Sequence, residues 1–297
     1  MSSHKILVAV DPFTKESTDE AIVTLNSFAN AFDYSVQAAS VISPDRVLWP
    51  EDFDESWRDS FQQIGEGALK ETLEKGGAPQ SWNRVIVTES KSSAKAAAHA
   101  LVSAARDSRS DMLGVIAFQR PNHWLGGFAN RLINESPFPV LIVKAKSPAV
   151  TKFKRLLFAT DFDDADRAGF AKAVEMARQA GAKLVLVSVL IAPPAEVIES
   201  SGLIGGLSNL DRFLKKQEIA ARNSAEEWMK AFPNADVEWV LFYATTGVSD
   251  AILTICQNQS CDAIFMRSSS APVAAFLLGS VARDVVHRAS VPVFVMK

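Results

Sequence analysis

The sequence predicts an α/β protein made of two tandem, doubly wound open domains, each with a parallel sheet of five strands. Two observations lead to this prediction. The same sequence pattern occurs twice, and within each copy short apolar runs alternate with stretches of helical spacing. The length of 297 residues also suits two domains of ordinary size.

The repeat is visible at both ends of each half. The opening run KILVAVD, Lys5 to Asp11, returns as RLLFATD, Arg155 to Asp161. The closing run FPVLIVK at 138–144 returns as VPVFVMK at 291–297. Because head and tail repeat in register, we interpret the chain as a duplication, with domains at 1–147 and 151–297 and a short, proline-containing linker around Pro148.

Continuous runs of Val, Ile, Leu and Phe are typical of parallel strands buried on both faces. Such runs occur at 6–10, 35–42, 84–88, 111–118 and 140–143, and again at 155–160, 183–190, 237–243, 262–266 and 292–296. The stretches between them have helical spacing. The longest, 208–232, is predicted to begin with Ser208 as its N-cap.

Composition excludes several classes of protein. With 48% hydrophobic and 22% charged residues, the chain is not disordered, and a net charge of -3 without a basic half argues against nucleic-acid binding. The N-terminal apolar run is interrupted by Asp11 and is too short for a secretory h-region, and no stretch approaches the roughly 18 apolar residues of a membrane span. Cys256 and Cys261 do not form a disulfide framework, so we expect buried thiols and a cytoplasmic protein.

The sequence predicts neither a catalytic group nor a metal site. Ser92 to Lys95 fits the pattern S-x-x-K, but an N-cap serine followed by a surface lysine explains it better. The four histidines are scattered, and the two cysteines lack the spacing of a zinc site.

In open α/β sheets, ligands bind beyond the carboxyl ends of the strands, where the strand order reverses. Asp11 and Asp161 follow the first strand of each half. Gly126–Gly127 and Gly279–Ser280 open the last helix of each half, where backbone N–H groups are available to an anion. Tight packing of the turn is the alternative explanation for these small residues, and we favour it.

Together, the Asp-ended first strand, the strand DAIFM at 262–266, the segment LGSVA at 278–282 and the closing VPV at 291–293 resemble the universal stress protein (UspA) superfamily, in its tandem two-domain type. The resemblance covers nearly the whole chain, twice. It implies the adenine nucleotide alpha hydrolase-like fold, with strand order 3-2-1-4-5 in each domain, and pairing through the last strands. In one branch of the superfamily it also implies ATP, held by the aspartate after strand 1 and by a Gly-x2-Gly-x9-Gly-Ser/Thr pattern after strand 4.

The chain departs from that pattern. The final Gly-Ser/Thr pair of the pattern matches Gly279–Ser280 in the second half. In the first half the corresponding pair is Gly126–Gly127, which lacks the hydroxyl group. The first two glycines are replaced by Arg267 and Ser270 in the second half and by Ile116 and Gln119 in the first half. Side chains at these positions would block the close approach of backbone to phosphate. We therefore do not expect ATP in domain 1.

For domain 2 two interpretations remain. Arg267 and Asp161 end neighbouring strands and are expected to form an ion pair that fills the crevice. Alternatively, Arg267 is a phosphate-binding cation, with hydroxyl groups from Ser268, Ser269, Ser270 and Ser280 around it.

The long connections 43–56 and 192–208 are interpreted either as covers over a site or as ordinary packing against the neighbouring domain. The functional expectation is a non-catalytic binding and interaction protein of the bacterial stress response, with degenerate nucleotide sites. An ATP-binding switch or weak ATPase in domain 2, a carrier of a small apolar or phosphorylated metabolite under 192–208, and a homodimer all stay open.

Overall fold

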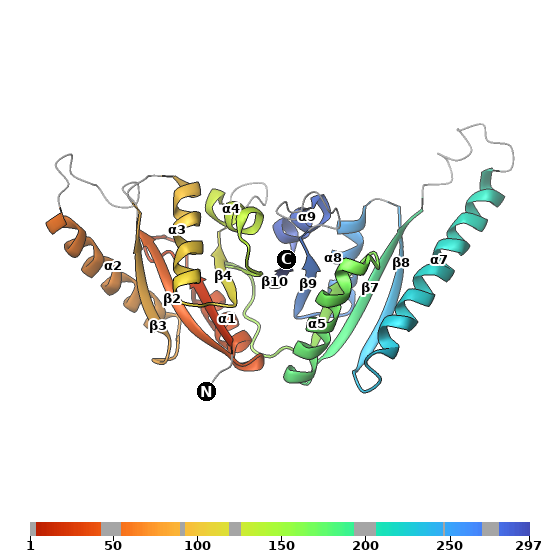
Figure 1. The fold of residues 1–297 in the computed structure, drawn as a ribbon, viewed down its shortest axis with the longest axis horizontal. Coiled ribbons are helices and arrows are strands. Elements are labelled where there is room, and N and C mark those ends of the chain that lie inside the picture. The colour runs from red at the N-terminus through yellow and green to blue at the C-terminus, as the bar shows by residue number, and fades with distance from the viewer. Residues whose placement is uncertain are drawn as a thin grey trace.

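A computed structural model describes residues 4–42, 55–89, 93–118, 126–192, 206–245, 247–268 and 279–297. Its strands form one sheet in the order β3-β2-β1-β4-β5-β10-β9-β6-β7-β8 (Figure 1). Within each half all pairings are parallel, and the half-sheets follow the order 3-2-1-4-5. The expected fold class is therefore confirmed.

The elements of the first half alternate strictly between strand and helix. They are β1 (His4–Ala9), α1 (Asp19–Ala31), β2 (Tyr34–Ile42), α2 (Glu55–Lys75), β3 (Asn83–Thr88), α3 (Ala94–Asp107), β4 (Met112–Ala117), α4 (Gly127–Glu135) and β5 (Val140–Lys144). The second half follows with β6 (Arg155–Ala159), the short 3-10 helix η2 (Asp164–Asp166), α5 (Arg167–Ala180), β7 (Lys183–Ile191), α7 (Gly206–Lys230), β8 (Val237–Ala244), α8 (Val248–Asn258), β9 (Ala263–Arg267), α9 (Ser280–Arg288) and β10 (Val293–Met296).

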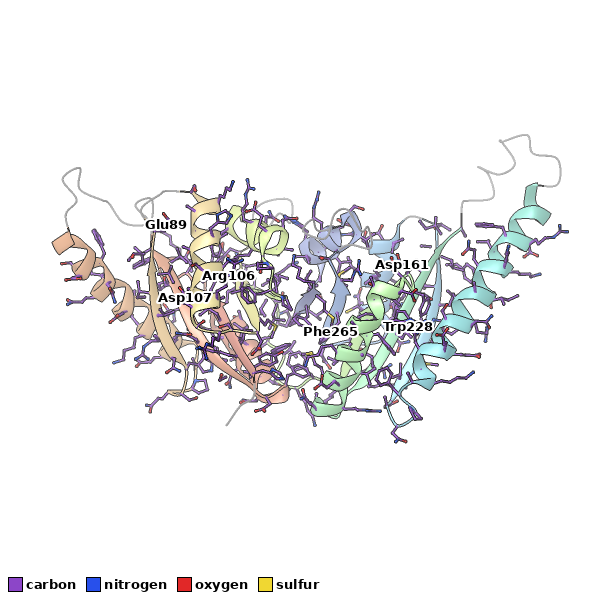
Figure 2. All side chains as sticks on the ribbon, viewed as in Figure 1. Glu89, Arg106, Asp107, Asp161, Trp228 and Phe265 are labelled. Atoms are coloured by element: carbon purple, nitrogen blue, oxygen red, sulfur yellow. The ribbon has the colours of Figure 1, made fainter. Side chains whose placement is uncertain are left out.

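Helices cover both faces of the sheet. Side chains of α1, α2, α5 and α7 form one core with the strands, and those of α3, α4, α8 and α9 form the other. Each core runs through both halves. Figure 2 shows side chains filling these layers, with Phe265 near the middle of the molecule and Trp228 within the second half.

Two predictions about helix starts have different outcomes. The N-cap of α3 is Ser93, whose side chain accepts the N–H of Ala96 at 3.0 Å, so the N-cap explanation of this serine segment is confirmed. The N-cap prediction for Ser208 is wrong, because α7 already begins at Gly206. α7 ends at Lys230, since the residue before Pro233 is disfavoured in helical conformation. Most of the connections 43–56 and 192–208 lie outside the described residues.

The two halves join through their last strands. β5 and β10 pair antiparallel, with Leu141 opposite Phe294, as the pairing of last strands predicts. Phe294 also contacts Phe28 of α1, with ring centroids 6.3 Å apart. Phe153, which follows the linker, packs on the rings of Phe28 and Phe32 at 5.8 and 5.3 Å. The junction is thus a paired edge with an aromatic core beneath it.

A lysine at the end of each last strand reaches into the other half. Lys144 ends β5, is only 6% exposed, and donates to the carbonyl oxygens of His287 and Ala289 at 2.8 and 2.6 Å, at the C-terminal end of α9. Lys297 follows β10 and donates to the carbonyl of Ile133 in α4 at 2.7 Å. Cations suit helix C-termini, so the repeated closing lysines act as reciprocal caps.

Replacing Lys144 with methionine keeps most of the aliphatic stem but removes the donor to two carbonyls. We expect Lys144→Met to lower the free energy of unfolding by about 2 kcal/mol, because buried acceptors lose their partner. Urea denaturation measures the change. Lys152→Met, at an exposed lysine beside the linker, is the matched control and is expected to have no such effect. Equal stability of the two variants would contradict the capping role.

Stability should also depend on pH through Lys144. Burial lowers the pKa of its ammonium group from 10.5 to about 8. Between these values the unfolded chain binds the proton and the folded protein releases it, so the free energy of unfolding rises with pH. We expect Lys144 to contribute a gain of about 1–2 kcal/mol from pH 8 to pH 9.5. Lys297, whose pKa burial also lowers to about 8, contributes in the same direction, so urea denaturation should show a smaller but not abolished gain in Lys144→Met.

Candidate functional site

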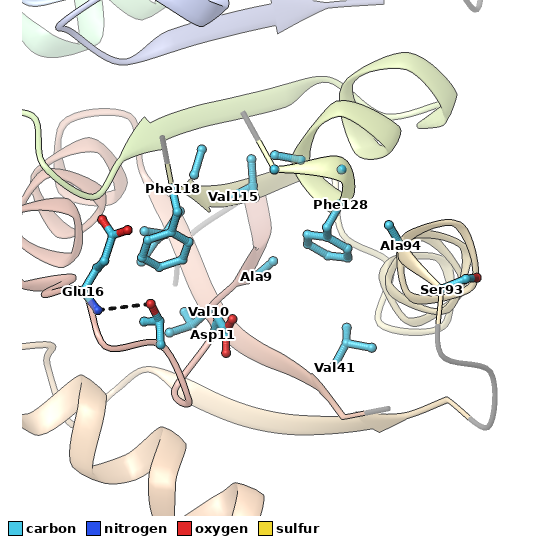
Figure 3. Close-up of a pocket in the computed structure, with 16 residues that line it drawn as sticks. Ala9, Val10, Asp11, Glu16, Val41, Ser93, Ala94, Val115, Phe118 and Phe128 are labelled. Carbon is cyan, nitrogen blue, oxygen red and sulfur yellow. Dashed lines mark hydrogen bonds between the residues drawn. The ribbon is translucent and has the colours of Figure 1, made fainter. Parts of the chain in front are cut away.

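Each half contains a crevice at the carboxyl ends of its first and fourth strands, as the fold predicts. The crevice of domain 1 has a cavity of about 610 Å³ and that of domain 2 one of about 330 Å³. The cavities are lined by the end of β1 or β6, the end of β4 or β9, and the first residues of α4 or α9. Figure 3 shows the crevice of domain 1, the larger of these two.

Both predicted aspartates line their crevices and both shape the turn that follows. Oδ1 of Asp11 accepts the N–H of Phe13 at 3.1 Å, and Oδ1 of Asp161 accepts the N–H of Asp163 at 3.2 Å. Between the latter two lies Phe162, with a φ of 64° that is unusual for a bulky residue. These aspartates therefore act at least as local turn formers.

In domain 2 the structure shows an ion pair, but the acid differs from the one expected. Nε of Arg267 lies 3.3 Å from Oδ1 of Asp166, five residues beyond the expected Asp161. Asp166 is 5% exposed, and its Oδ2 accepts the hydroxyl of Thr160 at 2.8 Å. The η2 turn carries Asp166 inward, which chain position relative to β6 does not reveal.

The electrostatics of this pair are set by burial. Burial raises the pKa of the Asp166 carboxyl, and the neighbouring Asp161 raises it further. The hydrogen bond from Thr160 and the Arg267 guanidinium lower it. Arg267 thus supplies positive charge to a buried carboxyl inside the crevice, where it also lines the cavity.

The two glycine segments lie at the N-termini of α4 and α9 and line the cavities. The tight-packing explanation finds no support at Gly126 in the described part of the chain, because a Cβ placed there would meet none of its atoms within 4 Å. Its φ of -57° also suits any residue. At Gly127 a Cβ would lie 3.5 Å from that of Ala94, an ordinary contact. Ser280 begins α9 and is exposed, whereas Ser270 and Gln119 lie outside the described residues.

In domain 1 the residue at the first replaced glycine is part of the cavity wall. Ile116 is 4% exposed and lines the cavity with Val115 and Phe118. Glu16 also lines it and pairs with Lys146 of the linker at 3.1 Å. Glu16 and Asp166 stand five residues after the repeated aspartates, and this repeated acid is the signal that sequence reasoning missed.

Across the described parts of the chain, no three His, Cys, Asp or Glu side chains gather as a metal site. Cys256 and Cys261, both buried, are free thiols, as expected. Among the described helices, none has the length and apolar character needed to cross a membrane.

Comparison with known proteins gives one family. The model of the universal stress protein family matches residues 2–144 and again 152–297. A universal stress protein from Archaeoglobus fulgidus has 18% identity and a TM-score of 0.61, with 100% of this chain and 97% of that chain covered. A functionally unknown protein from Pseudomonas aeruginosa PAO1 has 16% identity and a TM-score of 0.61, covering 99% and 92%. A comparison with curated proteins gives no match.

Removing the arginine should leave Asp166 as a buried carboxylate without its counter-charge. We expect Arg267→Met to destabilise the protein by about 3 kcal/mol at pH 7, and by less at pH 5. The sign follows because the folded pKa of Asp166 rises further above its unfolded value, so protonation at lower pH relieves the cost. Urea denaturation of Arg267→Met, Arg267→Met/Asp166→Asn and the exposed control Arg212→Met checks this. If the double variant fails to recover stability, the pair is not the cause.

Proposed function

Because the chain belongs to the universal stress protein family in both of its halves, we propose that it is a non-catalytic binding and interaction protein of the stress response, whose nucleotide sites have degenerated. The observation that supports this proposal is that side chains stand where the family pattern has its first glycine. Ile116 lines one crevice, and Arg267, paired with Asp166, lines the other.

The absence of glycine at these positions matters because phosphate groups are bound by backbone N–H groups at close range. An isoleucine side chain prevents that approach and offers no hydrogen bond. An arginine already engaged with a buried acid must first leave it, which exposes a buried carboxylate to an incoming anion. Both arrangements oppose ATP. They leave two surface crevices and a rigid ten-stranded scaffold, which suit binding and partner recognition in the cytoplasm.

A second candidate is an ATP-binding switch or weak ATPase in domain 2. It is favoured by the position of Arg267, Gly279 and Ser280 around one cavity. In this mechanism the γ- or β-phosphate would take the place of Asp166 beside the guanidinium, and the N-terminus of α9 would face the phosphates. Asp161 and Ser270 would complete the site by their place in the family pattern.

Isothermal titration with ATP and Mg²⁺ separates the two candidates. The proteins are the wild type, Gly279→Val, which blocks the mouth of the domain 2 crevice, and Gly126→Val, its counterpart in domain 1. We expect no saturable binding in any of them, because side chains replace the glycines that the family pattern has near the phosphates. Binding that Gly279→Val abolishes and Gly126→Val retains would establish the switch and overturn our proposal.

A further inference from the structure

The two crevices can be compared position by position, because the duplication places equivalent residues in equivalent roles. Asp11 and Asp161 form the same turn. The fourth strands are aligned by the N–H groups of Leu113 and Ile264, which donate to the carbonyls of Pro139 and Pro292 at 3.0 and 2.9 Å. Gly126 and Gly279 are both N-caps of the following helix. In this alignment Ile116 is equivalent to Arg267, and the neighbours of these two residues are equivalent in the same order.

The two crevices share their acidic side chains but differ in polarity at other equivalent lining positions. Four lining positions differ in this sense: Val10 for Thr160, Ile116 for Arg267, Ala117 for Ser268, and Gly127 for Ser280. At a fifth position domain 1 has the aromatic ring of Phe128, where domain 2 has Val281. To lose phosphate binding, it would be enough to replace the glycine of the family pattern with a side chain at position 116. This replacement does not explain why these positions also lack hydroxyl groups, which line this crevice only at other positions, Thr14 and Ser93 among the described residues.

The apolar side chains enclose space in this crevice. Figure 3 shows the rings of Phe118 and Phe128 on either side, with Ala9 and Val115 between them. Small residues form the floor, and the cavity of about 610 Å³ lies within the range of small-molecule sites. Both rings are only partly buried, so apolar surface faces the cavity.

The charges of the crevice argue against an anionic ligand. The charged side chains among its described lining residues are Asp11 and Glu16, both acidic. The cation paired with Glu16 comes from Lys146 of the linker, whose side chain is 71% exposed and does not line the cavity. A phosphate or carboxylate would therefore meet like charge, whereas the equivalent crevice in domain 2 has an arginine.

We propose that the crevice of domain 1 binds a small, uncharged, largely apolar organic molecule without phosphate groups, held between Phe118 and Phe128. This inference rests on the proposed function as a binding protein and names the ligand class of one site. Burial of apolar surface provides the affinity, and the acidic rim excludes nucleotides. The two domains of the chain then differ in the chemistry of their ligands.

Nile red, an uncharged dye that becomes fluorescent in apolar surroundings, is the probe. We expect saturable binding with one site per chain in the wild type. Gly126→Leu adds a large side chain to the lining of the cavity, at a position where a Cβ meets no atom of the described residues within 4 Å and the φ of -57° suits any residue. It should weaken binding at least about tenfold. Gly67→Leu adds the same side chain at an exposed glycine on α2, where a Cβ is equally free, and should leave binding unchanged.

Each result decides the inference. Absence of saturable binding in the wild type, or equal binding by Gly126→Leu and the wild type, would overturn it. Displacement of the dye by millimolar ATP in the wild type would overturn the exclusion of phosphates. Urea denaturation midpoints of both variants confirm that they are folded. Failure with Nile red leaves the ATP titration result intact, so the two proposals fail separately.

Discussion

The rest of the structure depends on the antiparallel pairing of β5 with β10. This contact turns two five-stranded sheets into one and covers two edges that would otherwise attract other strands. The lysines at the ends of these strands connect this pairing to the two crevices. Lys144 caps α9 and Lys297 caps α4, and the opposite ends of these two helices line the crevices. The position of each candidate site is therefore fixed in part by a side chain of the other domain.

In both crevices a carboxyl group near the first strand is paired with a cation, but the cation comes from a different part of the structure in each half. Each half places a carboxyl five residues after its first-strand aspartate, as Glu16 or Asp166. In domain 2 the counter-charge comes from the crevice wall, through Arg267, and the pair occupies space there. In domain 1 it comes from the linker, through Lys146. Moving the cation out of the wall allows an apolar residue at position 116 and accompanies the larger cavity.

Much of this fold could be predicted from the sequence, because parallel strands and amphipathic helices leave local patterns and the repeat doubles every signal. The place of Asp11 and Asp161 in the crevices follows from their position after the first strands, and the side chain at Ile116 was identified by comparison with the family pattern. The partner of Arg267 was not predicted, because a single turn of 3-10 helix carries Asp166 inward. The acid repeated at Glu16 and Asp166 marks this position in the sequence but does not show that the side chain turns into the crevice. The role of Lys144 was equally hidden. A lysine at a strand end looks like a surface residue until the other domain is placed against it.

Degeneration alone does not account for the crevice of domain 1. A domain released from nucleotide binding would gain stability by filling its cavity, since each buried methylene group contributes about 0.8 kcal/mol. Yet small residues remain at Ala9, Ala117 and Gly127, and two partly exposed phenylalanine rings face the space between them. Such apolar surface is unfavourable in contact with water, at about 25 cal/mol per Å². A crevice that keeps both the space and the apolar walls is more consistent with a site that is used than with one that has been lost.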